Sequence, residues 1–575
     1  MAIIGIDLGT TNSLASVWKN GRGVLIPNPL GEYLTPSAVS LEEDGTVLVG
    51  KSARERLISH PEQSAASFKR AMGTDKRFRL GSRDFTPEEL SSLVLRRLRE
   101  DAEQYLGEPV TEAVVSVPAY FTDRQRAATK RAGELAGLRV ERLVNEPSAA
   151  ALACRMAQRE EDRSCLVFDF GGGTLDVSVV DCFENIVSIL AVSGDNCLGG
   201  NDFDRCIAEY FCEENGLSFH SLSPVQQALL LKQAELAKIA LASRETVMLV
   251  LTGEGTSGSL TLSRQKFIEI SASLFQRMTQ PVRRALADSG LSPEDLSDVI
   301  LVGGSCKMPA TARWIAKFLG KKPVPLGSPD TVVALGAGIY AAMKERCTEL
   351  KELVLTDICP FTLGTGILNP NDPSRPLLAP IIERNSILPT SKSQRFYTIR
   401  DGQTKICVDI YQGEGLHCDE NLRLGEVNIP IPPAPKGQEN VDVRFTYDIN
   451  GILEVEVCNQ STGRSERAVI VGKESGVSDE EATRRLQELA SLKINPRTQE
   501  ENRLALARGE RLYQETLGET RQKVAQAVGW FEQVLAGQEP LHIAKSRKRF
   551  LELLDFLEAG SSPNLPGDDL WEDEE

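Results

Sequence analysis

Two short stretches of the chain repeat one arrangement of residue types that suits the binding of phosphate groups. GIDLGTTNS starts at Gly5 and VFDFGGGTLDVS starts at Val167, and each runs from an apolar strand through Asp and a glycine-rich turn to Thr and a second apolar strand. Glycines allow a tight turn whose successive backbone N–H groups point at an anion. One such turn is weak evidence, since glycine-rich hairpins are common. Two copies predict duplicated half-domains whose turns face each other across a cleft and hold the β- and γ-phosphates of a ligand from both sides.

A metal site is predicted between these turns, because acidic residues end or follow the strands that carry them. Carboxylate, water and phosphate oxygens are the ligands that Mg²⁺ prefers. The candidate metal residues are Asp7, Asp169 and Asp176. A third stretch, LVGGSCKMP at residues 301–309, is a strand, a double glycine and a helix start, and a flat base could lie against its backbone. By itself, that stretch is more often an ordinary strand-to-helix turn.

The composition argues against several classes of partner. A net charge of −16 opposes nucleic acid as a main ligand, since phosphate backbones need a basic face, and it also opposes anionic membrane surfaces. No apolar run approaches the ~20 residues of a spanning helix, and the first residues lack the basic start of a signal peptide, so we expect a cytoplasmic protein. The 12 cysteines occur singly beside only 4 His, which argues against a zinc site or a disulfide framework.

The pattern of strand-like and helical runs changes along the chain, which predicts a multidomain protein. Residues 1–350 alternate strand-like and helical runs, as α/β folds do. After a linker at 351–358, residues 359–474 hold short alternating strands with turn signals, which is typical of an all-β domain. Residues 475–560 are helical in pattern, and residues 561–575 form an acidic tail rich in Pro and Gly.

One stretch that fits the P-loop pattern competes for the role of phosphate binding. GTVLVGKS, at residues 45–52, matches G-x-x-x-x-G-K-S to the letter. A P-loop needs a flexible loop between its glycines, whereas Thr-Val-Leu-Val is an apolar run of strand-forming residues. We therefore expect a strand there, joined to the preceding strand by an Asp44-Gly45 turn, and no catalytic role for Lys51.

Six stretches together resemble the DnaK family of heat-shock chaperones. They are IGIDLGTTNS, VPAYFTDRQRAATKRAGELAGL, RLVNEPSAAALA, VFDFGGGTLDVSVV, GDNCLGGNDFD and LVGGSCKMP. SFKRAMG, LTDICP and IIERN are similar to the bacterial branch called HscC. The resemblance covers about residues 1 to 475, and it implies an α/β actin-like (ribonuclease H-like) ATPase domain, an all-β peptide-binding sandwich and an α-helical lid. It implies an ATP-dependent chaperone that holds extended hydrophobic segments of unfolded proteins and acts in the stress response.

The resemblance assigns catalysis and phosphate binding to specific residues. Lys69 matches the lysine that acts at the γ-phosphate and the attacking water, and Glu146 matches the acidic residue coupled to metal and water. Positioning and charge stabilisation do most of the work in phosphoryl transfer. Two alternatives remain open: an ordinary surface lysine at position 69 and a helix N-terminal charge at position 146. The implied catalytic set is Lys69, Glu146, Asp169, Thr174 and Asp7.

The implied ligands are ATP or ADP and Mg²⁺, with K⁺ as a further candidate ion. The phosphate contacts carried over are Gly9, Thr10, Thr11, Asn12, Gly171, Gly172, Gly173, Thr174, Gly199 and Gly200.

The adenosine side of the predicted site departs from the family pattern. Glu235 and Lys238, three residues apart on one helix face, fit the family contacts, and Gly303, Gly304, Ser305 and Asp330 complete the set. The family's serine one turn later is Ala242 here, and its base-stacking arginine is Lys307. Because an ammonium group cannot stack as a planar guanidinium does, we expect weaker adenosine contacts or faster exchange.

Coupling between the domains is implied by a further set of matching positions. The linker resembles the family's apolar interdomain segment, although Thr356 interrupts its aliphatic run; a short strand or a helix end is the alternative. The matching positions for allostery and for a J-domain cochaperone are Pro118, Arg126, Arg142, Asn145 and Asp357. A nucleotide exchange factor is a further implied partner, and we expect a monomer.

The peptide pocket and the lid also follow from the resemblance. An extended peptide can pair with sheet edges through its backbone and place an aliphatic side chain in a pocket. The matching pocket positions are Thr365, Leu368, Phe396, Ile399, Ile406, Val408 and Ile410. Thr365 is smaller and Ile399 bulkier than is usual, which predicts an altered peptide preference. The helical region is shorter than a full family lid, which predicts faster peptide release.

Two other functions stay open on the sequence alone. An actin-fold kinase for a small molecule would need a second substrate pocket and a base, and it would not need a β-sandwich with a lid. A chaperone-like regulator with one dedicated client would bind ATP without general refolding activity.

Overall fold

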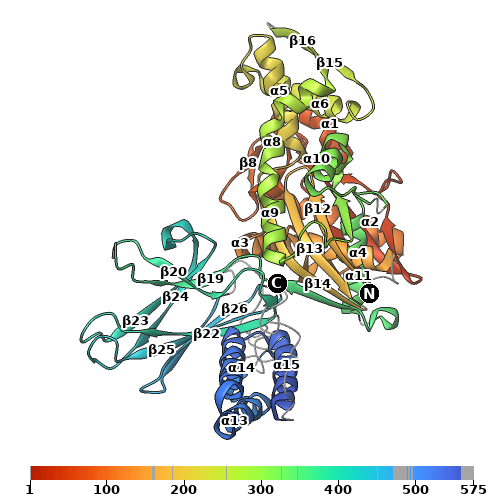
Figure 1. Ribbon diagram of the computed structural model, residues 1–575. Coiled ribbons are helices and arrows are strands. Elements are labelled where there is room, and N and C mark those ends of the chain that lie inside the picture. Colours follow the sequence, from red (N-terminus) through yellow and green to blue (C-terminus); the bar gives the residue numbers. More distant parts are fainter. Residues whose placement is uncertain are drawn as a thin grey trace. The chain divides into compact units, whose positions relative to one another are not determined.

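Two sheets with the same strand plan carry the two glycine-rich turns (Figure 1). In the computed structural model, the described residues are 2–157, 162–183, 185–253, 256–324, 327–345, 347–449, 451–470, 489, 493 and 496–558. The described residues form two units, one up to Pro360 and one from Phe361 onward. The predicted tail, residues 561–575, lies outside the described residues.

The first sheet holds the first turn between antiparallel strands. β1 (Ile3–Asp7) pairs antiparallel with β2 (Asn12–Lys19) and parallel with β10 (Glu112–Val117). β2 continues to β3 (Arg22–Ile26) and contacts β4 (Thr35–Pro36), while β10 pairs with β11 (Arg139–Asn145).

The second sheet repeats this plan around the second turn. β12 (Arg163–Phe170) pairs antiparallel with β13 (Leu175–Phe183) and parallel with β17 (Asp298–Val302), and β13 continues to β14 (Ile186–Asp195). β12, β13, β14 and β17 therefore correspond to β1, β2, β3 and β10. The duplication expected from the two motifs is present in the strand pairing itself.

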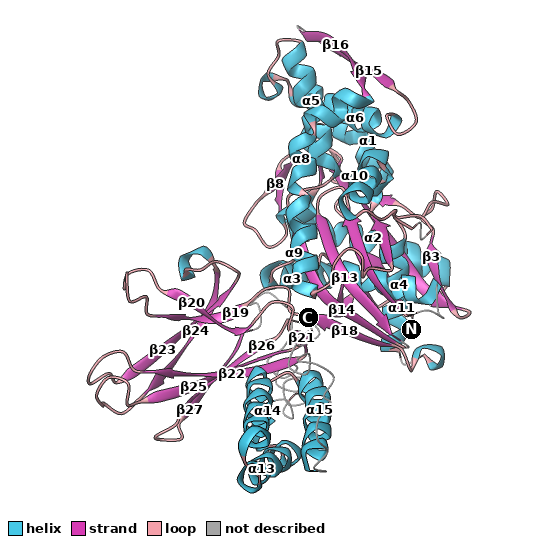
Figure 2. Ribbon diagram, viewed as in Figure 1, coloured by secondary structure: helices cyan, strands magenta, loops and turns pink. Residues whose placement is uncertain are grey.

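Helices pack on both sheets, and the closest approach lies where α4 (Glu146–Ala157) crosses α11 (Val332–Lys344). A Cβ added at Gly336 would lie 1.8 Å from the Ala149 carbonyl oxygen, and one at Gly5 would lie 2.1 Å from the Gly338 nitrogen. Glycine is required at these crossings because no side chain fits there. Figure 2 shows α9 (Thr279–Ser289) running along the second sheet, where it packs on β13 and β14.

The unit also contains further α-helices and strands. The helices are α1 (Lys51–Ser59), α2 (Pro87–Leu106), α3 (Asp123–Leu135), α5 (Gly200–Glu214), α6 (Pro224–Ala240), α7 (Arg264–Ile270), α8 (Ala272–Arg277) and α10 (Pro309–Leu319). The strands are β5 (Ala38–Leu41), β6 (Val47–Val49), β7 (Ser64–Ala66), β8 (Phe78–Leu80), β9 (Arg83–Phe85), β15 (Thr246–Gly253) and β16 (Thr256–Ser263).

The P-loop-like stretch folds as the apolar run predicts. β6 pairs antiparallel with β5, and Gly45 has φ 89° in the turn before it, where the Thr46 N–H donates to the Asp44 carboxylate. Lys51 begins α1, is half exposed and pairs with Glu32 at 2.6 Å. No flexible phosphate-binding loop lies between these glycines.

The segment predicted as a linker includes a strand that belongs to the first unit. β18 (Val354–Ile358) pairs parallel with β14, with Thr356 opposite Ser188. The polar residue therefore does not interrupt the strand, because its backbone groups pair as those of its neighbours do.

The second unit is a pair of four-stranded sheets followed by helices. One sheet runs β20 (Leu377–Ile382), β19 (Leu363–Ile367), β23 (Lys405–Gln412) and β24 (Leu422–Pro430), and the other runs β22 (Thr390–Tyr397), β25 (Asn440–Tyr447), β26 (Leu453–Asn459) and β27 (Ser465–Ile470). β21 (Ile387–Leu388) precedes β22.

Three helices pack together after the sheets. They are α13 (Glu500–Glu515), α14 (Gly518–Gly537) and α15 (Pro540–Glu558), around a core that contains Phe531 and Phe550. Gln538, which follows α14, exchanges two hydrogen bonds with the Ser393 backbone of β22. None of the helices in the described part of the chain is both long and apolar enough to cross a membrane.

Candidate functional site

A cavity of about 440 Å³ lies between the two halves of the first unit and is lined by both glycine-rich turns. Most of the residues predicted from the sequence line it. They are Asp7, Gly9, Thr10, Thr11, Asn12, Lys69, Glu146, Asp169, Gly171, Gly172, Thr174, Gly200, Glu235, Lys238, Ala242, Gly303, Gly304, Ser305, Lys307 and Asp330. Gly173, Gly199 and Asp176 are not among the lining residues, although they adjoin residues that are.

The two turns approach each other closely. A Cβ at Gly172 would lie 1.9 Å from Thr11 Oγ1, and a Cβ at Gly173 would lie 2.6 Å from Thr10 Oγ1. The second turn is closed by the Gly171 N–H, which donates to the Thr174 carbonyl at 3.1 Å. The glycines thus leave backbone, rather than side chains, on both walls of the cavity.

The third predicted stretch is joined directly to the second turn. Ser305 Oγ donates to the Gly171 carbonyl at 2.7 Å, and the Gly200 N–H donates to the same oxygen at 3.0 Å. Gly303 has φ 85°, and a Cβ there would lie 2.5 Å from the Phe170 carbonyl oxygen. The strand-to-helix turn at residues 301–309 therefore forms a wall of the same cavity.

Three carboxylates gather at one end of the cavity: the half-buried Asp7 and the buried Asp169 line it, and the buried Asp176 lies opposite Asp169 on the neighbouring strand. Burial, followed by the negative charge of Glu146, raises the pKa of Asp7 to about 7 and that of Asp176 to about 7. Burial also raises the pKa of Asp169 well above its ordinary value, with Glu146 as the next cause. Among the described residues, Asp176 Oδ2 has no hydrogen-bond partner. A bound cation would stabilise the ionised forms of these like charges, and an all-oxygen set with one acceptor that has no partner fits hydrated Mg²⁺.

Lys69 and Glu146 form a buried ion pair beside these carboxylates. Lys69 Nζ lies 2.7 Å from Glu146 Oε1, and their side chains are 5% and 10% exposed. Lys69 belongs to a single 3-10 turn, Phe68–Ala71, and Glu146 is the first residue of α4. The alternative of a surface lysine is wrong, because the ammonium group lies inside the cleft. Glu146 also lies at the N-terminus of α4, as the alternative expected. A helix N-terminal charge and a carboxylate in the cleft are therefore compatible roles for this residue.

The predicted adenosine side of the cavity contains ion pairs that join α6 to α5 and α1. Lys238 Nζ lies 2.8 Å from Asp204 and donates to the Gly200 carbonyl at 2.9 Å. Glu235 pairs with Arg54 of α1, a residue that sequence reasoning missed because 181 positions separate the two.

The substituted positions on this side keep their place at the cavity. Lys307 is half exposed and pairs with Asp330. Ala242 lines the cavity, and the neighbouring Ser243 is exposed and donates its hydroxyl to the Ala240 carbonyl. Ser243 therefore does not replace the serine expected one turn after Lys238.

The predicted coupling residues meet at β18. The half-buried Asp357 accepts from Asn145 Nδ2 at 2.7 Å and from Ser148 Oγ at 3.2 Å. Arg126 donates to Asn145 Oδ1 at 2.6 Å and to backbone carbonyls of the loop that begins at Pro118. Burial raises the pKa of Asp357.

Arg142, on the same strand as Asn145, is near the Tyr340 hydroxyl. The pKa of that hydroxyl is raised mainly by burial, and the Arg142 charge opposes the shift. The structure thus gathers Arg126, Asn145 and Asp357 into one network and places Arg142 beside it.

The predicted peptide-binding residues in the second unit differ in exposure. Thr365, Val408 and Ile410 are buried, Phe396 and Ile406 are half-buried, and Leu368 and Ile399 are each 41% exposed. Thr365 Oγ1 donates to the Asp409 carbonyl at 2.8 Å. The Thr365 hydroxyl is therefore hydrogen-bonded inside the sandwich, whereas the side chains of Leu368 and Ile399 lie at its surface.

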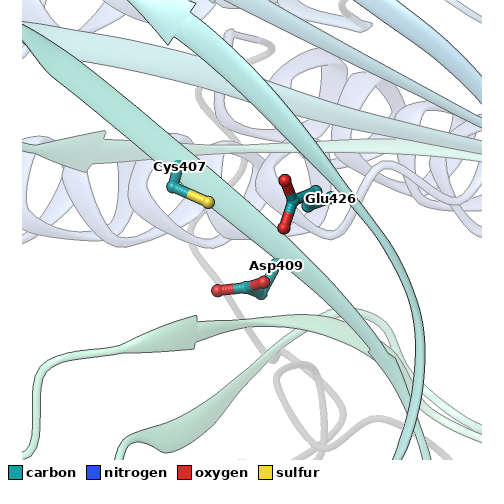
Figure 3. A group of neighbouring side chains, drawn as sticks. All are labelled: Cys407, Asp409 and Glu426. Carbon is teal, nitrogen blue, oxygen red and sulfur yellow. The ribbon is translucent and has the colours of Figure 1, made fainter.

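Another cluster of metal-ligand residue types lies on β23 and β24. Figure 3 shows Cys407, Asp409 and Glu426 with their side chains close together. Arg423 pairs with both carboxylates, at 2.7 Å to Asp409 and 2.5 Å to Glu426. The guanidinium pairs with both carboxylates and offsets part of their negative charge, and surface carboxylates paired in this way do not require a metal ion.

The comparison with protein families agrees with the geometry of both units. The family model described as Hsp70 protein matches residues 3–81 and 77–549. This match spans the duplicated sheets, the cavity between them, the β-sandwich and most of the helices that follow it. With its mixed α/β nucleotide-binding region, its β-sandwich and its C-terminal helices, the chain belongs to the Hsp70 family.

Proposed function

We propose that the chain is an ATP-dependent molecular chaperone. ATP hydrolysis in the cleft of the first unit would switch the affinity of the second unit for extended hydrophobic segments of unfolded proteins. Members of the family are ATPases that bind ATP with Mg²⁺ and bind unfolded polypeptides. The observation that carries the proposal is the buried Lys69–Glu146 pair between two facing glycine-rich turns. ATP, ADP and Mg²⁺ are the proposed ligands, with K⁺ as a further candidate.

The residues of the cleft suit phosphoryl transfer to water. Backbone N–H groups of the turns Gly9–Asn12 and Gly171–Thr174 would bind the phosphates, with the Thr hydroxyls as further donors. The Lys69 ammonium would stabilise charge that develops on the γ-phosphate, and the Glu146 carboxylate would orient the attacking water. In such a site, preorganised charge does most of the catalysis. Mg²⁺, when bound, would be held largely through water by Asp7, Asp169 and Asp176, and it would neutralise phosphate charge.

Communication between the units is proposed to run through β18. A ligand shifts a conformational equilibrium only by its different affinities for the two states. The Arg126–Asn145–Asp357 network ties β18 to α3 and α4, so nucleotide-dependent movement of those helices would change how firmly β18 pairs. A J-domain cochaperone would bind at Arg142, Asn145 and Asp357 and so stimulate ATP hydrolysis in the cleft. A nucleotide exchange factor is a further proposed partner. Membership of the HscC branch, a cytoplasmic location and a monomeric state belong to the same proposal.

A dedicated chaperone or regulator for one client is the second candidate. It is favoured by Thr365, whose hydroxyl is bound inside the sandwich, and by the exposed Ile399. Refolding of several unrelated substrates with a matched J-domain protein separates this role from a general one. Membership of the Hsp70 family removes the ground for the small-molecule kinase.

The direct test of the proposed activity compares two lysines. Lys69→Ala removes the ammonium group from the cleft and should lower the single-turnover rate of ATP hydrolysis roughly 100-fold or more. Lys51→Ala changes the P-loop-like stretch and should leave that rate unchanged, since Lys51 pairs only with Glu32 in the described structure. Hydrolysis that is retained by Lys69→Ala and lost by Lys51→Ala would refute the assignment.

A further inference from the structure

Arg70, the residue after Lys69, connects the two halves of the first unit behind the phosphate turns. Its Nε donates to the Gly173 carbonyl at 2.9 Å, and its two terminal nitrogens donate to Asp202 at 3.2 and 2.6 Å. Arg70 lies in the 3-10 turn Phe68–Ala71 of the first half, whereas Gly173 and Asp202 belong to the second half. We call these contacts the Arg70 bridge.

Each end of the bridge is fixed to a different part of the predicted phosphate site. Asp202 Oδ2 also accepts from the Gly199 N–H at 2.7 Å, at the start of α5. Gly173 is part of the second glycine-rich turn, and its carbonyl is the acceptor for Arg70. A single guanidinium therefore joins the Lys69 turn to the second turn and to the loop before α5. A bidentate carboxylate pair gives such a contact a defined geometry.

A second contact, between Asn201 and Ser67, also joins the Lys69 turn to the second half, on the N-terminal side of Lys69. Asn201 Nδ2 donates to Ser67 Oγ at 3.0 Å, and the Asn201 N–H donates to the Gly172 carbonyl at 2.9 Å. Ser67 has φ 57°, a left-handed conformation that a non-glycine residue keeps only when its surroundings hold it there. Lys69 is thus flanked on both sides by side chains that reach across to the second half.

Arg70 itself is not among the residues that line the cavity. Its side chain is 25% exposed and that of Asp202 is 26% exposed, so the pair lies at the edge of the cleft rather than in its floor. A change at Arg70 would therefore alter the alignment of Lys69 without removing a group that touches the nucleotide.

We propose that Arg70 is a positioning residue for ATP hydrolysis. This inference rests on the proposed ATPase function. Because the bridge joins the Lys69 turn to the second glycine-rich turn, the two turns would close on the phosphates at the same time as the Lys69 ammonium is placed. Because small displacements of a positioned group cost large factors in rate, loss of the bridge should act on the chemical step far more than on binding.

The test measures single-turnover hydrolysis and the dissociation constant for ATP on the full-length chain. Arg70→Met should slow hydrolysis about 30-fold and change the dissociation constant by less than about threefold. Arg70→Lys, which can reach one acceptor but not both, should fall between Arg70→Met and the natural chain. Arg124→Met is the matched control, since Arg124 pairs with Asp75 on the surface of the first half, and it should hydrolyse ATP at the natural rate.

Asp202→Asn gives an independent arm of the same experiment. Asparagine keeps an acceptor for the Gly199 N–H but loses the charge that faces Arg70, so it should slow hydrolysis in the same direction. The double variant of Arg70→Met and Asp202→Asn should be no slower than Arg70→Met alone, because both changes remove one interaction. If Arg70→Met does not fold, Asp202→Asn and Arg70→Lys decide the question.

Two results would overturn the inference, and they differ from failure of the proposed function. Equal hydrolysis rates in Arg70→Met and the natural chain would remove the positioning role. A loss of ATP affinity as large as the loss of rate would show a binding role instead. Absence of hydrolysis in both the natural chain and Arg124→Met would refute the ATPase function itself.

Discussion

At the scale of single residues, the cleft is marked by ionisable groups that are buried or half-buried. Asp7, Asp169, Asp176 and Glu146 face one ammonium group, Lys69. This excess of negative charge makes the empty floor of the cleft unfavourable for ionised carboxylates and favourable for a divalent cation. This charge balance suits the proposed binding of a metal ion together with phosphates.

A pH dependence follows from these carboxylates. The pKa values of Asp7 and Asp176 are raised to about 7 in the folded chain, so between about pH 4 and pH 7 the folded state binds protons that the unfolded state does not. The stability of the nucleotide-free protein should fall as pH rises through this window. Binding of Mg·ADP should release protons at pH 6.5 and almost none at pH 8.5, where the carboxyls are already ionised.

Calorimetry of Mg·ADP binding in two buffers with different ionisation enthalpies measures that release. Asp176→Asn should lower the number of protons released at pH 6.5. Equal proton release at the two pH values would contradict the account of the cleft floor.

Two substitutions on the predicted adenosine side should make nucleotide binding tighter. Lys307→Arg should keep the pair with Asp330 and present a planar surface to the base, while Ala242→Ser adds a hydroxyl to the cavity wall. The double variant should lower the dissociation constant for ADP about three- to tenfold. Lys317→Arg, at an exposed position of α10, serves as the control, and an unchanged constant in the double variant would defeat the idea.

At the scale of elements, the glycines decide how close the turns can come. A Cβ at Gly199 would lie 2.5 Å from backbone atoms of Gly172 and Gly173, whereas a Cβ at Gly171 would lie 3.8 Å from its nearest neighbour, the Thr174 oxygen. The neighbours of Gly199 are backbone atoms that cannot rotate away. The loop before α5 and the second turn therefore hold each other in place.

Two alanine substitutions in this region should behave differently. Gly199→Ala should push the second turn out of position and weaken ATP binding about tenfold or more, whereas Gly171→Ala, whose added Cβ would lie 3.8 Å from the nearest protein atom, should weaken it clearly less. Equilibrium titration with a fluorescent ATP analogue measures both constants. Similar affinities for the two variants would show that the contact at Gly199 does not govern the turn.

The element scale also shows what the sequence can and cannot predict. The repeated order of strand, Asp, glycine turn and Thr predicts the two hairpins, and the alternation of Ile406, Val408 and Ile410 predicts a sandwich strand, because these signals are local. The Arg54–Glu235 pair and the Arg70 bridge join residues 181 and 132 positions apart. No local pattern marks either contact, since an arginine on a short turn or helix has many possible partners in a sequence.

At the scale of the whole molecule, the proposed function places a nucleotide site in one unit and a peptide site in the other. β18 ends the first unit, and β19 begins the sandwich only a few residues later. Hydrogen bonds from Asn145 and Ser148 to Asp357 fix β18, the last strand before the sandwich, to the rest of the first unit. The proposed function requires this connection to carry the state of the nucleotide to the peptide site.

The most direct measurement of that claim is the dissociation rate of a fluorescent, extended, apolar peptide from the full-length chain. With Mg·ATP bound, we predict a rate at least about tenfold faster than with Mg·ADP. Lys69→Ala, which should bind ATP without splitting it, should stay in the fast-release state. Identical peptide release rates in the two nucleotide states, with both nucleotides shown to be bound, would contradict the account.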